Sequence, residues 1–174
     1  MAELTGFPSV FASNTSASDA AAAHVVGYHA HDTSGNTYRY VKFAGAYITG
    51  EVVVMDSAWL ATRLTATLRG FVGIVMANQT ANYYGWVQVS GVNTFCWADT
   101  GVTTVDPVLA PVTTDLGHLA VQTSADTSVG IWGIHAATAP DSCASTALGT
   151  SAVSAPCTVT LAFPFITGAF SVSS

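Results

Sequence analysis

The stretch "YYGWVQVSG", residues 83–91, decides the fold class of this chain. It alternates as a β-strand does, because successive side chains of a strand point to opposite faces. The two faces are Tyr84, Trp86, Gln88 and Ser90 against Tyr83, Gly85, Val87 and Val89. Two neighbouring aromatic rings on one face are either a platform on which a sugar or base stacks or part of a packed sheet.

Other short strand patterns, separated by Gly, Asn, Asp or Pro, lie on both sides of this stretch. They are "TYRYVKF" (37–43), "EVVVMD" (51–56), "FVGIVMA" (71–77), "NTFCWAD" (93–99), "HLAVQTS" (118–124), "VGIWGIHAA" (129–137) and "CTVTLAFPF" (157–165). The segment 57–70 is ambiguous, and we expect at most one helical turn in it. About eight to ten short strands predict an all-β fold, a β-barrel or β-sandwich of short antiparallel strands.

The chain of 174 residues is long enough for one domain with an appended arm. Residues 1–23 are low in complexity, and we interpret them as an extended N-terminal arm in front of a single β domain, 24–174. Phe7 and Phe11 are the large apolar residues of this arm. The alternative is a frayed terminus, but two Phe residues favour an arm that docks on a neighbouring subunit.

Charged residues make up only 8% of the chain, where about 25% is usual for soluble domains. A free monomer relies on ionised side chains for solubility, so this scarcity indicates a surface covered by other protein, as in a permanent assembly. The formal net charge is −6, and the four cations form no patch in the sequence. Neither nucleic acid nor an anionic membrane is therefore an expected partner.

The N-terminus lacks the basic start and apolar run of a signal peptide, and no apolar stretch reaches the roughly 20 residues of a membrane span. We therefore expect synthesis in a cytoplasm. The three cysteines do not describe a disulfide framework. Cys96 is predicted to be a small apolar strand residue. Cys143 and Cys157 flank a Ser/Thr/Ala loop, and either remain free or form a bridge in an oxidising medium.

A weak internal repeat is present. Residues 70–91 and the later segments 128–143 and 157–163 both contain Val-Gly-Ile, an apolar run, a turn-rich insert and an alternating strand. Two such hairpins that close on each other suit a barrel or sandwich.

The best metal candidates are His24, His29, His31 and Asp32, since His29 and His31 would point the same way on a strand. A tight site needs three or four supported ligands, so the favoured interpretation is a polar strand near the arm, without a metal or other cofactor. No nucleophile elbow, zinc-protease, phosphate-loop or dinucleotide motif is present. Glu51 is the one glutamate outside the arm. The chain is predicted not to be an enzyme.

The four tryptophans lie in four different segments, so each is expected to anchor a different part of a core. We therefore interpret Tyr84 and Trp86 as residues that pack against a neighbouring sheet or subunit. The alternative remains an exposed face that holds a sugar.

The runs "VGIVMANQTANYYGWVQVSG" (72–91), "DPVLAPVTTDLGHLAV" (106–121), "SVGIWGIHAA" (128–137) and "CTVTLAF" (157–163) resemble small capsid-associated proteins of tailed phages. The resemblance covers roughly residues 38–165 and centres on "YGWVQ". It implies a decoration (cement) protein, a β-barrel or β-sandwich that forms a homotrimer and clamps neighbouring hexamers of the major capsid protein on the outside of the virion. It implies no catalytic residue.

Under this resemblance the interface candidates are Phe7, Phe11, Tyr84 and Trp86. The alternative function is a phage head or tail appendage whose Tyr84/Trp86 face binds host carbohydrate.

Overall fold

The computed structural model describes residues 15–65, 67–99, 109–111, 116–121, 131–136 and 154–166. This part of the chain is built of strands and contains no helix, so the all-β prediction is confirmed. None of its segments is therefore a helix long and apolar enough to cross a membrane. The strands are β1 Ser18–Asp19, β2 His29–His31, β3 Thr37–Phe43, β4 Val52–Met55, β5 Leu60–Arg63, β6 Gly70–Val75, β7 Tyr84–Asp99, β8 Leu109–Pro111, β9 Leu119–Val121, β10 Ile131–Ala136 and β11 Ser154–Ile166.

Five strands close a first ring, which makes the fold a β-barrel. The beginning of β7 pairs antiparallel with β3 and β6, β6 pairs with β4, and β4 pairs with β5. The ring closes where β5 runs parallel to β3, with Lys42 opposite Leu60. The buried side chains that pack within this ring are Val41, Phe43, Tyr47, Val53, Met55, Ala61, Val75, Val87 and Val89.

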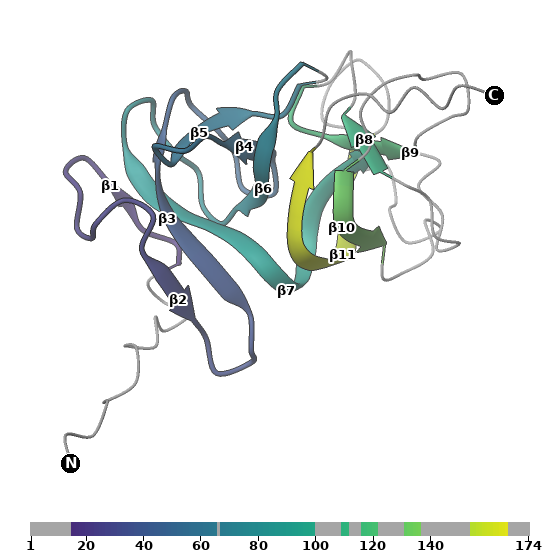
Figure 1. The fold of residues 1–174 in the computed structure, drawn as a ribbon, viewed down its shortest axis with the longest axis horizontal. Coiled ribbons are helices and arrows are strands. Elements are labelled where there is room, and N and C mark those ends of the chain that lie inside the picture. Colours follow the sequence, from purple (N-terminus) through teal and green to yellow (C-terminus); the bar gives the residue numbers. More distant parts are fainter. Residues whose placement is uncertain are drawn as a thin grey trace.

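The rest of β7 belongs to a second ring with the same connectivity. It pairs antiparallel with β11, β11 with β10, β10 with β8, and β8 with β9. The ring closes where β9 runs parallel to β7, with Leu119 opposite Ala98. Figure 1 shows β7 running from the part that holds β3 to the part that holds β10 and β11.

The strands β6 and β7 in the first ring thus correspond to β10 and β11 in the second. These are the segments in which the sequence repeats, so the weak repeat coincides with a repeated arrangement of strands.

One continuous strand, β7, replaces the two short strands that the sequence predicts at 83–91 and 93–99. Gly91 lies between them with a φ of 97°, a conformation that costs glycine little. The chain therefore bends at Gly91 without leaving the sheet, and it changes its main partner from β3 to β11.

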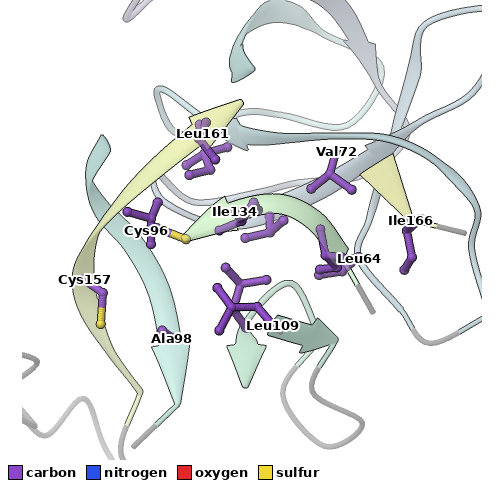
Figure 2. Close-up of a cluster of buried hydrophobic side chains, with 14 of the residues drawn as sticks. Leu64, Val72, Cys96, Ala98, Leu109, Ile134, Cys157, Leu161 and Ile166 are labelled. Carbon is purple, nitrogen blue, oxygen red and sulfur yellow. The ribbon is translucent and has the colours of Figure 1, made fainter. Parts of the chain in front are cut away.

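A hydrophobic cluster joins the two rings. On β4 the side chains alternate, so that Val53 and Met55 face the interior of the first ring while Val52 and Val54 contact the cluster shared with the second. Figure 2 shows Val72, from β6, in one cluster with side chains of the second ring. The shared cluster is Val52, Val54, Leu64, Val72, Ile74, Cys96, Ala98, Leu109, Leu119, Ile131, Ile134, Cys157, Val159, Leu161 and Ile166.

The described end of the predicted arm, residues 15–23, lies against the barrel. Ser18 and Asp19 form β1 and pair with β7, and the Tyr40 hydroxyl donates to Asp19 at 2.6 Å. The ambiguous segment 57–70 contains the strand β5. Cys157 is disulfide-bonded, while its predicted partner Cys143 lies outside the described residues.

Candidate binding site

Tyr84 and Trp86, the predicted aromatic face, pack inside this chain's own structure. Trp86 is 1% exposed and its ring meets that of Tyr40 edge to face at 5.1 Å between centroids. Tyr84 is partly buried, with its ring stacked on Tyr40 at 6.3 Å and the Lys42 ammonium 5.9 Å from its centroid. These residues therefore form a packed layer on the outer face of β3 and β7, and Trp86 offers no open surface for a sugar.

The histidines proposed as metal ligands have other neighbours. His24 lies among aromatic rings, 5.0 Å from Tyr40 and 5.3 Å from Trp86. His29 and His31 have ring centroids 4.7 Å apart. The Asp32 carboxylate accepts hydrogen bonds from Asn36 and Tyr38 and from the backbone of Ser34 and Asn36. No group of three or more metal-ligating side chains occurs among the described residues.

A pocket lies where β3, β4, β6, β7 and β11 meet the turn between β4 and β5. Its cavity volume is about 40 Å³. We call it the Trp59 pocket. Its lining residues are Arg39, Met55, Trp59, Phe71, Val72, Val89, Phe163 and Pro164.

Trp59 is held by the tight turn that joins β4 to β5. One carboxylate oxygen of Asp56 accepts the backbone N–H groups of Ala58 at 2.8 Å and Leu60 at 2.9 Å. This short polar loop is a turn that an aspartate side chain typically stabilises. It leaves Trp59 with a φ of 59°, in the left-handed region that bulky residues rarely adopt.

Two half-exposed phenylalanines form the mouth of the pocket. Phe71 is 54% exposed and its ring stacks on Trp59, with centroids 6.0 Å apart. Phe163 is 49% exposed and has a φ of 49°. Only three non-glycine residues in the described part of the chain have a positive φ, and Trp59 and Phe163 are two of them. Such strained residues concentrate at ligand-binding and switch sites.

Arg39 supplies the pocket with its positive charge. Its guanidinium lies 4.7 Å from the Trp59 ring centroid and donates one hydrogen bond to the Gly27 carbonyl at 2.8 Å. Partial burial lowers the pKa of Arg39. Among the described residues Arg39 has no carboxylate partner, whereas Arg63 pairs with Glu51 at 3.2 Å.

His29 is the cross-strand neighbour of Arg39 and lies beside Phe163, with ring centroids 6.3 Å apart. Its Nε2 atom is buried and has no hydrogen-bond partner in the described structure. Burial lowers the pKa of His29, and the charges of Arg39 and His31 lower it further, which favours the neutral ring. The pocket thus combines an aromatic mouth with the guanidinium of Arg39, and Arg39 is next to a histidine whose buried Nε2 atom has no hydrogen-bond partner in the described structure.

Sequence reasoning missed this pocket and singled out other residues. Its residues come from five strands and one turn, and only the barrel brings them together. The segment that contains Trp59 is ambiguous in sequence, and Phe71 alternates with Gly73 as an ordinary strand residue does. The two predicted arm residues, Phe7 and Phe11, lie outside the described residues.

Comparison with known proteins adds no family to this geometry. No protein-family model, curated protein or solved structure matches the chain. The function is therefore inferred from the composition, the fold, the pocket and the resemblance of the "YGWVQ" region.

Proposed function

We propose that the chain is a structural protein of a tailed phage, a decoration (cement) protein that binds the outside of the capsid. It is made in the host cytoplasm, assembles as a homotrimer and stabilises the head by contacting neighbouring subunits of the major capsid protein. It performs no catalysis and binds neither nucleic acid nor a membrane.

One observation carries this proposal: half-exposed aromatic residues surround a pocket on a chain in which only 8% of residues are charged. Exposed apolar patches on soluble proteins mark sites of interaction. Phe71 and Phe163, which both line the Trp59 pocket, are 54% and 49% exposed, and the chain has few ionised groups that would oppose association. A subunit whose surface is permanently covered by other protein does not need more ionised groups for solubility.

The fold supports the same assignment. Closed rings leave few unpaired strand edges, so association depends mainly on side chains. Apolar burial is also less sensitive to salt than ion pairing between exposed groups. Binding of the proposed kind should therefore persist at high ionic strength.

The test combines light scattering with sedimentation on phage heads that lack this chain. We expect a trimer in solution, and co-sedimentation with heads that changes little between low and high salt. A monomer that stays in the supernatant would contradict the proposal.

The alternative function, a module that binds host carbohydrate, has less support from the structure. It depends on Tyr84 and Trp86 as a stacking face, and Trp86 is 1% exposed.

A further inference from the structure

We propose that β2 is a pH-sensitive edge of the barrel, which is paired with β3 at neutral pH and separates from it in acid while the two rings stay folded. The groups responsible are three basic side chains, His29 and His31 on β2 and Arg39 on β3, which we call the basic cluster. This inference concerns the chain by itself, so it does not depend on the proposed function.

The basic cluster lies on one face of the β2–β3 pair. His29 and Arg39 are directly opposite each other in the antiparallel register. The rings of His29 and His31, two residues apart on the same strand, have centroids 4.7 Å apart. Like charges directly opposite each other destabilise a pair of strands. Protonation of His29 therefore places a second positive charge against that of Arg39.

No member of the basic cluster forms an ion pair with a carboxylate among the described residues. The Asp32 carboxylate accepts the Tyr38 hydroxyl at 2.8 Å, and Tyr38 points to the opposite face of β3 from its neighbour Arg39. Strand β11 contributes the ring of Phe163, 6.3 Å from that of His29, and contains no acidic or basic residue. The titratable groups that face His29 are therefore the other two members of the cluster, and both are basic.

The Nε2 atom of His29 adds a cost of its own. It is buried and has no hydrogen-bond partner in the described part of the chain. One nitrogen of a neutral imidazole accepts hydrogen bonds, whereas both nitrogens of the protonated ring are donors. Protonation would therefore leave a charged, buried N–H group without an acceptor, which is costly. Burial, and after it the charges of Arg39 and His31, lower the pKa of His29 from its ordinary value of 6.5.

Strand β2 is the element that gives way. It is three residues long and lies at the edge of the sheet, beside β3 (Figure 1). Backbone hydrogen bonds from Gly27 and Tyr28 to Tyr40 extend this pairing. Separation of β2 would take His29 away from Arg39 and let its ring bind a proton in water. Strand β3 also pairs with β5 and β7, so its separation would open the first ring.

The direction of the pH dependence follows from proton linkage. The open form binds a proton at an ordinary pKa near 6.5, and the paired form binds it at a lower pKa. Acid therefore favours the open form. The contribution of His29 to the pairing is complete above pH 6.5 and is lost as the pH falls from 6.5 through the lowered pKa. The opening equilibrium rises by at most about tenfold for each pH unit of this interval.

Hydrogen exchange of the full chain, followed by mass spectrometry of its peptides, measures this opening. Exchange is compared at about pH 8 and about pH 5, with exchange times scaled to the intrinsic rate at each pH. The peptide that contains β2 reports on the edge. The peptide that contains β4, which is paired on both sides, reports on the barrel.

Four variants identify the groups involved. His29→Gln removes the ring that titrates. Arg39→Gln removes the opposing charge, whereas Arg39→Lys retains it. His118→Gln is the matched control for loss of a histidine, because His118 stacks on Trp97, which belongs to the part of β7 in the second ring.

We expect the protection of β2 to fall about threefold or more from the higher to the lower pH in the unmodified chain and in His118→Gln, while β4 stays protected. The fall should be absent in His29→Gln, and smaller in Arg39→Gln than in Arg39→Lys. Equal protection of β2 at both pH values, or an equal fall in His29→Gln and the unmodified chain, would overturn the inference. Loss of protection in β2 and β4 together would also overturn it, because the whole chain would then unfold in acid. If His29→Gln does not fold, the two Arg39 variants decide, and equal falls in both overturn the inference.

Discussion

Gly27 is the residue against which the Trp59 indole packs. Its φ is 86°, and a Cβ atom added to it would overlap the indole nitrogen of Trp59. We therefore predict that Gly27→Ala displaces Trp59 and destabilises the protein more than the backbone strain alone would. Gly35→Ala is the control, because Gly35 has a φ of 83° and no atom lies within 4 Å of its added Cβ.

The left-handed backbone should lower the free energy of unfolding of each variant by roughly 1–2 kcal/mol. For Gly27→Ala alone, overpacking against Trp59 should lower it by about a further 1–3 kcal/mol. Urea unfolding of the two variants measures the difference. Equal losses would show that the indole moves aside freely and that its position is not fixed by Gly27.

Tyr40 makes the stability of the folded protein depend on pH in the alkaline range. Burial and, after it, the hydrogen bond to Asp19 raise the pKa of Tyr40 from 10.0 to about 12. A raised pKa in the folded state stabilises the protein fully below the ordinary value, and this contribution is lost as the pH rises from 10.0 to about 12. The unfolding free energy should therefore fall across this range.

In Tyr40→Phe the fall should be smaller, although not absent, because burial and Asp32 also raise the pKa of Tyr38. Urea unfolding at a series of pH values on both sides of 10.0 provides the comparison. An identical pH dependence in the variant and the unmodified chain would mean that Tyr40 ionises as readily when folded as when unfolded.

At the scale of the element, β7 is held at its bend by two buried amides. Asn93 donates to the Gln88 side-chain oxygen at 2.8 Å, and the Gln88 amide donates to the carbonyls of Ser90 and Val92. Gln88 and Asn93 are each 1% exposed. Gln88→Leu should therefore destabilise the protein by about 1–3 kcal/mol, because it leaves buried polar groups without partners.

The double variant Gln88→Leu with Asn93→Leu should lose less than the sum of the two single variants, since it removes both members of the pair. Chemical unfolding of all four proteins gives this coupling free energy. Simple additivity would show that the two amides stabilise β7 independently of each other.

The sequence predicts some elements well and others poorly, for reasons that lie in particular residues. Thr37–Phe43 and Val52–Met55 are strands as their patterns indicate. The continuity of β7 is not predictable, because Gly91 and Asn93 are turn residues in isolation and are accommodated here by Gln88. The Trp59 pocket is less predictable still, since it depends on the position of β11 beside β6, which no local pattern specifies.

At the scale of the whole molecule, the cluster shared between the rings should make the two halves unfold together. Ile74 of the first ring is fully buried in this cluster with Leu161 and Ile166 of β11. Ile74→Ala should therefore lower the free energy of unfolding by about 2–5 kcal/mol. Circular dichroism and tryptophan fluorescence should still follow one common transition, at a lower urea concentration than in the unmodified chain. Two separate transitions would show that the rings are independent units.

A strand that belongs to both rings also has a mechanical consequence. A force that pulls on the first ring reaches the second along the covalent backbone of β7, whereas two rings joined only by packed side chains would slide apart under the same tension. Extension would first require shear of the many hydrogen bonds on both edges of this strand at once. The protein is thereby suited to act as a tie between anchored points, which resists stretching rather than yielding at a hinge.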